Sequence, residues 1–208
     1  MQLREHTITQ FAEVLASDAP APGGGSVAAL NGTLAAALLR MTGALTVSKE
    51  KYKEFHADIR EIMAKAKELQ NALLAGIDED TMAFSKVSAV FSMPKATDED
   101  KAARNGAMQA ALKSATLTPL ETMKAAYGCL KLAALACGKI NTSCLSDFGT
   151  VVLCALASVR AAWLNVKINL SGIKDEDFTE RTGSEAREIL AEAEKLAEEL
   201  YARIEQTI

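Results

Sequence analysis

The 208-residue sequence is poor in aromatic residues and in proline. Phe, Trp and Tyr together make up 5% of the chain, and there are four prolines, whereas alanine is frequent throughout. Strands are enriched in aromatic and β-branched residues, and alanine is the strongest helix former, so this composition favours tightly packed helices over a β-sandwich. The sequence shows no β-hairpin signal and no period-two run of apolar residues. We therefore expect an all-α fold.

Metal-ligating residues are equally scarce. The chain has two histidines, four cysteines and no CxxC pair, so a zinc site is not expected and we assign no metal. Reduced, mostly buried thiols in a cytoplasmic protein are the better interpretation of the cysteines. The cysteines are Cys129, Cys137, Cys144 and Cys154.

The chain also lacks an excess of positive charge and an apolar leader. Its formal net charge is −4, which argues against nucleic acid as the main partner. The N-terminus has no apolar core of the kind that a signal peptide requires. Two long apolar stretches, 27–47 and 151–166, contain Asn31, Arg40 and Arg160, which are costly in a bilayer. We interpret both stretches as buried core helices, with no membrane partner.

Capping and breaking residues divide the chain into six or seven helices of one domain, residues 1–208. Thr118-Pro119-Leu120-Glu121 has the residues of a helix start, because it offers a cap, a proline at the first helical position and a glutamate. Ser146 is expected to cap the helix that follows the 139–145 loop. The expected helices begin at a capping box at Thr7, near residues 26 and 53, at an N-cap at Thr97, and near residues 118 and 146. After Ser171-Gly172, a last amphipathic helix carries the Glu/Lys pattern of 185–205.

The long helices are apolar on nearly all sides. A monomer of this size has too little interior to bury both apolar stretches completely. The prediction is therefore a helical bundle of long, Ala-rich helices that forms a homodimer.

The first candidate for chemistry is the Pro22-Gly23-Gly24-Gly25-Ser26 segment at a helix start. Glycines let a ligand approach the backbone, and free N–H groups in the following turn attract anions. The segment is neither a Walker motif nor a dinucleotide fingerprint, because the preceding strand and the Lys-Ser/Thr ending are missing. A structural turn remains the alternative.

The second candidate is the acidic run Asp78-Glu79-Asp80, which has apolar neighbours on both sides. Residues two apart on a helix point in different directions, so Asp78 and Asp80 cannot act as a pair on one face. A carboxyl held between apolar walls has a raised pKa, which suits a general acid. The alternative is a solvated acidic patch.

Further polar residues lie near helix ends. Asn165 and Asn169 are four apart on a mostly apolar helix and need partners if they are buried. Cys144 is not expected to act as a nucleophile, because no histidine lies near it in the sequence. Lys95, Arg104, Asn141 and Asp147 are the other polar candidates at helix breaks.

The order of these segments along the whole chain resembles the cyclodeaminase family of folate enzymes. That family includes the cyclodeaminase domain of formiminotransferase-cyclodeaminase and stand-alone bacterial relatives, among them methenyltetrahydrofolate cyclohydrolases. The matching residues are Ala21–Ala29, Asp78-x-Asp80 with Ala83-Phe84, Pro94-Lys95-x-Thr97 with Lys101 and Arg104, Pro119-Leu120, Asn141, Cys144, Ser146-Asp147, Asn165-Val166 and Asn169-Leu170.

The resemblance implies a dimeric all-helical enzyme whose folate site lies near the subunit interface. It implies conversion of 5-formiminotetrahydrofolate to 5,10-methenyltetrahydrofolate and ammonia, with Asp80, the second aspartate of D-x-D, as proton donor. No cofactor beyond the folate substrate is implied. We expect the glycines 23–25 with Ser26, and Lys95 or Arg104, to bind the negative charge on the folate tail, and Asp78 to bind substrate. Asp147 and the asparagines (Asn141, Asn165 and Asn169) are expected at the polar edges of the pterin. Cyclohydrolysis of 5,10-methenyltetrahydrofolate and non-catalytic folate binding are the alternatives.

Overall fold

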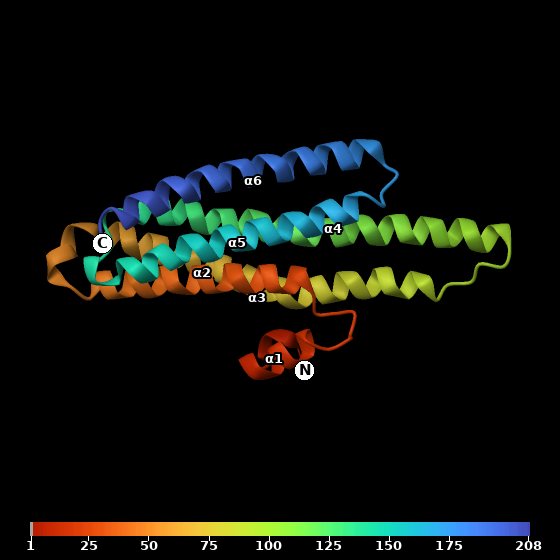
Figure 1. Cartoon of the computed structure of the whole chain (residues 1–208), viewed down its shortest axis with the longest axis horizontal. Helices are drawn as coiled ribbons and strands as arrows, with labels where there is room; N and C mark the ends of the chain where they lie inside the picture. The colour runs from red at the N-terminus through yellow and green to blue at the C-terminus, as the bar shows by residue number, and fades with distance from the viewer. Residues whose placement is uncertain (1) are drawn as a thin grey trace.

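The computed structural model describes residues 2–208, and within this range every regular element is helical. Six α-helices and three short 3-10 turns follow one another, and the long helices run nearly side by side in an elongated bundle (Figure 1). The all-α prediction is confirmed. The α-helices are α1 (Ile8–Leu15), α2 (Gly24–Val47), α3 (His56–Phe91), α4 (Asp98–Ala136), α5 (Leu145–Leu170) and α6 (Glu176–Glu205).

Helix α2 is the centre of the bundle and packs against both α3 and α5. Its inward face consists of small residues, which allow these neighbours to approach closely. A β-carbon at Gly32 would lie 2.7 Å from a Leu73 methyl of α3 and 2.9 Å from the Ser158 hydroxyl of α5. The Ser158 hydroxyl in turn donates a 2.7 Å hydrogen bond to the Ala28 carbonyl. The alanine- and glycine-rich sequence of α2 therefore fits the close packing of three helices.

Helix α4 is continuous through Pro119, so the prediction of a new helix start at Thr118 is wrong. The Thr97 cap at the front of the helix behaves as predicted, with its hydroxyl accepting from the Asp100 N–H. Pro119 itself is buried inside the helix. A proline there removes the N–H that would bond the carbonyl four residues earlier, which belongs to Ala115. That carbonyl finds a partner on another helix, described below.

The start of one other helix differs from the prediction. Helix α5 begins at Leu145 after a 3-10 turn, so Ser146 lies inside its first turn and makes no cap. The Asn141 side chain stabilises this entry, because its Oδ1 accepts from the Ser143 N–H. Helix α6 begins at Glu176, shortly after the expected break at Ser171-Gly172, with Asp175 accepting from the Phe178 N–H as its cap.

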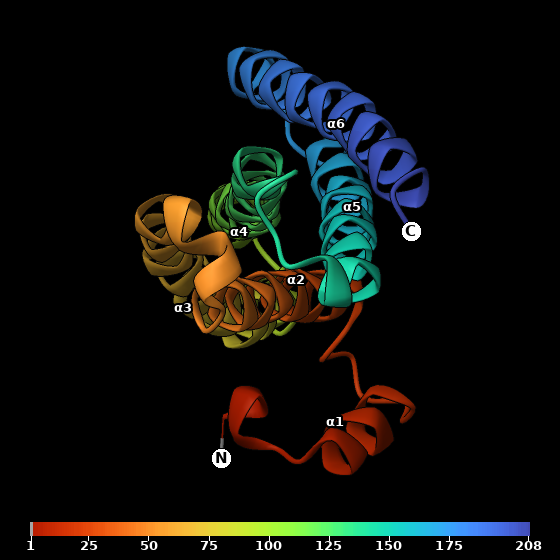
Figure 2. The same ribbon diagram turned by 90° about the vertical axis from the view of Figure 1, so that its left-hand side faces the viewer.

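The N-terminal arm, residues 2–23, contains a 3-10 turn (Leu3–Glu5) and α1 and lies outside the bundle (Figure 2). The predicted capping box at Thr7 is present. One side chain of α1, Phe11, is buried, and it packs with Ala29 of α2 and Ile77 of α3. The arm therefore rests on the bundle through a small apolar contact and the 3-10 turn.

Two segments, Gly24–Val47 and Thr142–Leu170, are long and apolar enough to cross a membrane by length and composition. The most apolar window is 50% buried in the first segment and 39% buried in the second. Each helix therefore carries core residues on one side and leaves an apolar stripe on the other. The stripe of α2 contains Leu34, Met41 and Leu45, and that of α5 contains Leu153, Leu164 and Ile168.

Candidate functional site

Asp80 projects from α3 toward the first turn of α2. Its Oδ2 accepts two hydrogen bonds from Ser26, one of 2.9 Å from the backbone N–H and one of 3.1 Å from the hydroxyl. The Ser26 hydroxyl also lies 3.0 Å from the Ile77 carbonyl. The carboxyl is thus held against the N-terminus of α2, where free N–H groups favour a negative group.

Gly25 makes this contact possible. A β-carbon at Gly25 would lie 2.0 Å from Asp80 Oδ1 and 2.5 Å from its Cγ, so any side chain there would force the Asp80 carboxyl to move. The absence of a side chain at Gly25 therefore lets the carboxyl of α3 lie flat on the backbone of α2. The sequence analysis assigned the glycine segment to an anionic ligand, whereas in the structure the anionic group nearest Gly25 is the chain's own carboxyl.

Burial raises the pKa of Asp80, and this effect outweighs the two hydrogen bonds from Ser26, which lower it. Among residues 2–208 no donor lies within hydrogen-bonding distance of Asp80 Oδ1. This oxygen is not fully buried, so it does not count among the buried polar atoms that lack a partner. One carboxylate oxygen is therefore fixed and the other is open. A partly buried carboxyl with a raised pKa is suited to general acid–base chemistry.

Asp80 lines a cavity of about 300 Å³, here named the Asp80 pocket. This volume is at the lower end of the range for small-molecule sites. The pocket is mostly apolar, with polar groups from α3 and α5. Its lining residues are Pro20, Ala21, Gly23, Gly24, Asp80, Ala83, Phe84, Val87, Ala115, Asn165, Ile168 and Asn169.

The structure thus brings together Asp80, Asn165 and the glycine segment, which lie far apart in the sequence. Gly24 lies next to Asn165, because a β-carbon there would be 3.5 Å from the amide nitrogen. The Asn165 amide donates a 2.8 Å hydrogen bond to the Ala161 carbonyl of its own helix. The pocket therefore joins the start of α2, the C-terminal third of α3, Ala115 of α4 and the end of α5.

Asp78 faces away from this pocket and binds the N-terminal arm. Its Oδ1 accepts a 2.7 Å hydrogen bond from the Leu3 N–H, and its Oδ2 forms a 3.3 Å ion pair with Arg4 Nε. The different directions of Asp78 and Asp80 agree with the helical geometry expected from the sequence. In the structure, Asp78 holds the arm on α3.

Lys95 and Arg104 lie at the tip of the α3–α4 hairpin, which projects past the ends of α5 and α6 (Figure 1). Lys95 is exposed in the connecting loop. The Arg104 Nε donates a 3.1 Å hydrogen bond to the Val90 carbonyl and so ties the two helices of the tip together. Neither side chain lines the Asp80 pocket.

Asn141 and Asp147 lie at the opposite end of the bundle. The Asn141 N–H donates to the Thr46 hydroxyl at 2.9 Å, and its amide donates to the Leu45 carbonyl at 3.3 Å. Leu45 is 19 residues along α2 from Ser26, which corresponds to about 29 Å at 1.5 Å per residue. Within one chain, these two residues are therefore remote from Asp80.

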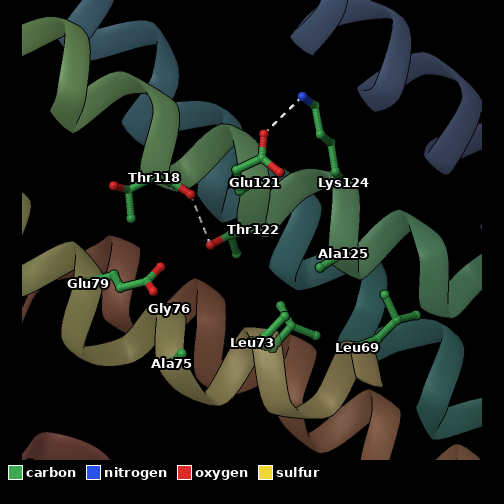
Figure 3. A pocket seen from close by; sticks show the side chains of 11 residues that line it. Leu69, Leu73, Ala75, Gly76, Glu79, Thr118, Glu121, Thr122, Lys124 and Ala125 are labelled. Carbon is green, nitrogen blue, oxygen red and sulfur yellow. Dashed lines mark hydrogen bonds and ion pairs between the residues drawn. The ribbon is translucent and has the colours of Figure 1, made fainter. Parts of the chain in front are cut away.

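A second hollow, of about 390 Å³, lies between α3 and α4 and is shown in Figure 3. Leu69 and Leu73 form part of its apolar wall. Its lysine, Lys124, is paired with Glu121 and Glu185 at 2.9 Å each. The acid beside Asp80, Glu79, lines this hollow and not the Asp80 pocket. We therefore place the candidate active site at the Asp80 pocket.

The sequence analysis did not foresee that α4 contributes a backbone carbonyl to the pocket. The Asn169 amide donates a 2.8 Å hydrogen bond to the Ala115 carbonyl, and both residues line the pocket. Pro119 was the available signal, because a proline inside a helix frees the carbonyl four residues before it. It was interpreted as a helix start instead.

Comparison with known proteins agrees with this geometry. Residues 7–188 match the family model described as formiminotransferase-cyclodeaminase. A methenyltetrahydrofolate cyclohydrolase of Methylorubrum extorquens is 40% identical over 97% of both chains. The formimidoyltransferase-cyclodeaminase of Gallus gallus is 30% identical over 94% of this chain, which spans 36% of that protein.

A solved structure has the same fold. The formiminotetrahydrofolate cyclodeaminase of Thermotoga maritima superposes with a TM-score of 0.84, covering 99% of this chain and 97% of that one at 25% identity. The chain belongs to the formiminotransferase-cyclodeaminase family. It is an enzyme of the cyclodeaminase or cyclohydrolase type, as the resemblance in the sequence implied.

Proposed function

We propose that this chain transforms the one-carbon unit carried between N5 and N10 of a tetrahydrofolate, and that Asp80 moves the proton. The observation that supports this most directly is the position of the Asp80 carboxyl, which is fixed by Ser26 through one oxygen, is open through the other and lines the pocket. The family membership supports the folate chemistry.

Both candidate reactions require one proton to move from a nucleophile to a leaving nitrogen. In cyclohydrolysis, water adds to the methenyl carbon and loses one proton, and N5 gains a proton as the C–N5 bond breaks. The second water proton leaves to solvent as the C=O forms, giving 10-formyltetrahydrofolate and a net H⁺. In cyclodeamination, N10 adds to the protonated formimino carbon. The carboxyl gives a proton to the departing amine and regains one from N10. The products are the methenyl cation and ammonia. A single carboxyl that both gives and takes a proton is sufficient for either reaction, and such a group contributes typically 10²–10⁴-fold to the rate.

The family resemblance of the sequence implies cyclodeamination as the main reaction, with cyclohydrolysis as an alternative. The 40% identical relative, which matches almost end to end, favours cyclohydrolysis for this chain. The Thermotoga maritima structure supports cyclodeamination, because it is also a match across nearly its full length. We therefore propose cyclohydrolysis as the main activity and retain cyclodeamination as the second candidate.

A two-substrate absorbance assay tests the choice. Purified protein is given 5,10-methenyltetrahydrofolate in one cuvette, and loss of the chromophore is compared with the buffer rate. It is given 5-formiminotetrahydrofolate in the other, and gain of the chromophore and ammonia are followed. Loss in the first cuvette supports cyclohydrolysis, and gain in the second supports cyclodeamination. Folate binding without turnover in either cuvette would leave only a binding protein.

Asp80→Asn tests the proton transfer. The amide has nearly the same shape as the carboxyl but cannot exchange a proton, so we expect kcat to fall about 10²-fold or more. Circular dichroism and the melting temperature serve as the folding control. Unchanged turnover in a folded variant would remove Asp80 from the mechanism.

We further propose that two copies pair through the apolar stripes of α2 and α5, so that the pocket lies near the interface. Ile168 supports this placement, since it is 71% exposed and yet lines the Asp80 pocket. In a pair related by a two-fold axis across the helices, the end of one copy that carries Asp147 would approach the pocket of the other. In this arrangement, Asn141 and Asp147 of one copy would lie near the folate site of the other copy.

Light scattering of the purified protein tests the pairing, and Leu164→Glu should yield monomers because it places a charge in the exposed α5 stripe. Mixing Asp80→Asn with Asp147→Asn tests a shared site. If each site uses Asp80 of one copy and Asp147 of the other, mixed pairs contain one intact site and regain activity. No regain after subunit exchange would contradict the shared site, while a monomeric wild type would contradict the pairing itself.

A further inference from the structure

The side-chain amide of Asn169 has a hydrogen-bonded nitrogen and, among residues 2–208, an oxygen with no hydrogen-bond donor. Its Nδ2 donates a 2.8 Å hydrogen bond to the Ala115 carbonyl across the α4–α5 contact. Among residues 2–208 no donor lies within reach of its Oδ1, and this oxygen is not a buried, unpartnered atom. Because Asn169 lines the Asp80 pocket, an oriented and accessible acceptor lies in the wall of the site.

Pro119 is the reason that this orientation is fixed. In an unbroken helix the Ala115 carbonyl would accept from the N–H of residue 119, but proline has none. Ala115 is buried, so its carbonyl needs a donor, and the Asn169 amide supplies it. An amide whose nitrogen is committed to a carbonyl must present its oxygen elsewhere.

From this arrangement we propose that Asn169 is a substrate-orienting residue, whose Oδ1 accepts a hydrogen bond from an N–H group on the pteridine ring of the folate. Pro119 acts through Asn169 as a positioning residue. The Asn165 amide repeats the pattern, since its Nδ2 is committed to the Ala161 carbonyl. The pocket wall on α5 therefore presents acceptors, and the reduced pteridine ring carries N–H donors at its 2-amino group, N3 and N8.

This inference rests on the proposed folate activity and adds a role for two residues. A purely structural role of Asn169 and a substrate-orienting role predict different effects of Pro119→Ala. If Asn169 only satisfies the Ala115 carbonyl, Pro119→Ala should be harmless, because it restores the helical N–H. If Asn169 orients substrate, the same change frees its amide to rotate and should weaken binding.

The experiment is a double-mutant cycle on the full chain with whichever folate substrate the wild type turns over. We expect Asn169→Ala to lower kcat/KM about 10-fold or more, mainly through KM, because it removes a buried substrate hydrogen bond. We expect Pro119→Ala to lower kcat/KM about 3-fold or more while the melting temperature stays equal or rises. In the Asn169→Ala background, Pro119→Ala should then add nothing.

Lys131→Ala, an exposed helical change outside the pocket, is the matched control for purification and assay. Wild-type kcat/KM in folded Asn169→Ala, or equal effects of Pro119→Ala in both backgrounds, would overturn the inference. A wild type that turns over neither folate would overturn the proposed function instead. For that case, equilibrium binding of tetrahydrofolate to the wild type and Asn169→Ala still tests the inference, and equal affinity would overturn it.

Discussion

Gly25→Ala is the sharpest structural perturbation of the site. The added β-carbon would lie 2.0 Å from Asp80 Oδ1, 2.5 Å from Cγ and 2.8 Å from Oδ2. Ordinary contact begins near 3.4 Å, so the carboxyl must retreat by about 1.4 Å. A shift of that size away from α2 breaks the hydrogen bonds of 2.9 and 3.1 Å that Ser26 donates.

The substitution should lower both the stability and the rate. Alanine in a helix is favoured over glycine by about 1 kcal/mol, which offsets part of the two lost hydrogen bonds at about 1–3 kcal/mol each. A displacement of a catalytic group by about 1 Å can cost about 10²-fold in rate. We therefore expect a folded protein whose kcat falls about 10²-fold.

Steady-state kinetics with the folate substrate, together with thermal melts, measures both quantities. Gly106→Ala is the matched control, because this glycine lies in α4 with no atom near its β-carbon position and should gain stability without losing activity. The sequence-based interpretation, in which the glycines bind an anionic ligand, predicts a raised KM with kcat preserved. A folded Gly25→Ala protein with wild-type kcat would refute the reasoning.

Three further predictions concern the same region. Ser26→Ala removes one bond that lowers the pKa of Asp80, so the limb of the pH–rate profile governed by this group should move to higher pH; an unmoved limb would separate Ser26 from the titration. The folded state raises the pKa of Asp80, so the contribution of this group to stability is present below its unfolded pKa and is lost as pH rises through its folded pKa. Urea titrations should therefore show the wild type losing stability relative to Asp80→Asn between these two pKa values. Asp78→Ala leaves the Leu3 N–H and Arg4 without their partner, so limited proteolysis should cut the N-terminal arm faster while turnover persists; equal cleavage rates would mean that Phe11 alone holds the arm.

The fold could be predicted well because local patterns and packing agree. Alanine-rich composition, the Thr7 and Thr97 caps and the 3.6-residue period all favour helices, and the structure has helices there. Pro119 was the exception, since a proline preceded by threonine looks like a helix start in the sequence. The structure continues the helix because Asn169, 50 residues later, supplies the donor that the Ala115 carbonyl lacks.

The cysteines illustrate what composition alone can establish. The four thiols are free, but only Cys129 and Cys144 are buried while Cys137 and Cys154 are partly exposed, so fewer are buried than expected. Burial raises the pKa of Cys129 to about 12, so this thiol stays protonated and unreactive. Cys144 also has a raised pKa, through burial and the nearby Asp147, which agrees with the expectation that it is no nucleophile.

The site could be predicted only in part, because side chains acquire their roles from neighbours that are distant in sequence. The apolar surroundings drew attention to the acidic run, and the helical period correctly separated Asp78 from Asp80. The choice of Asp80 came from the family resemblance. That Gly25 must be glycine could not be derived locally, since the reason lies 55 residues further along the chain in the Asp80 carboxyl. For Asn141 and Asp147 the sequence motifs suggested a common site, but the fold of one chain keeps them apart from Asp80. The separation is about 29 Å, from the length of α2 that lies between the two ends. Two apolar stripes that one copy leaves exposed offer the physical route by which a second copy could bring those residues to the pocket.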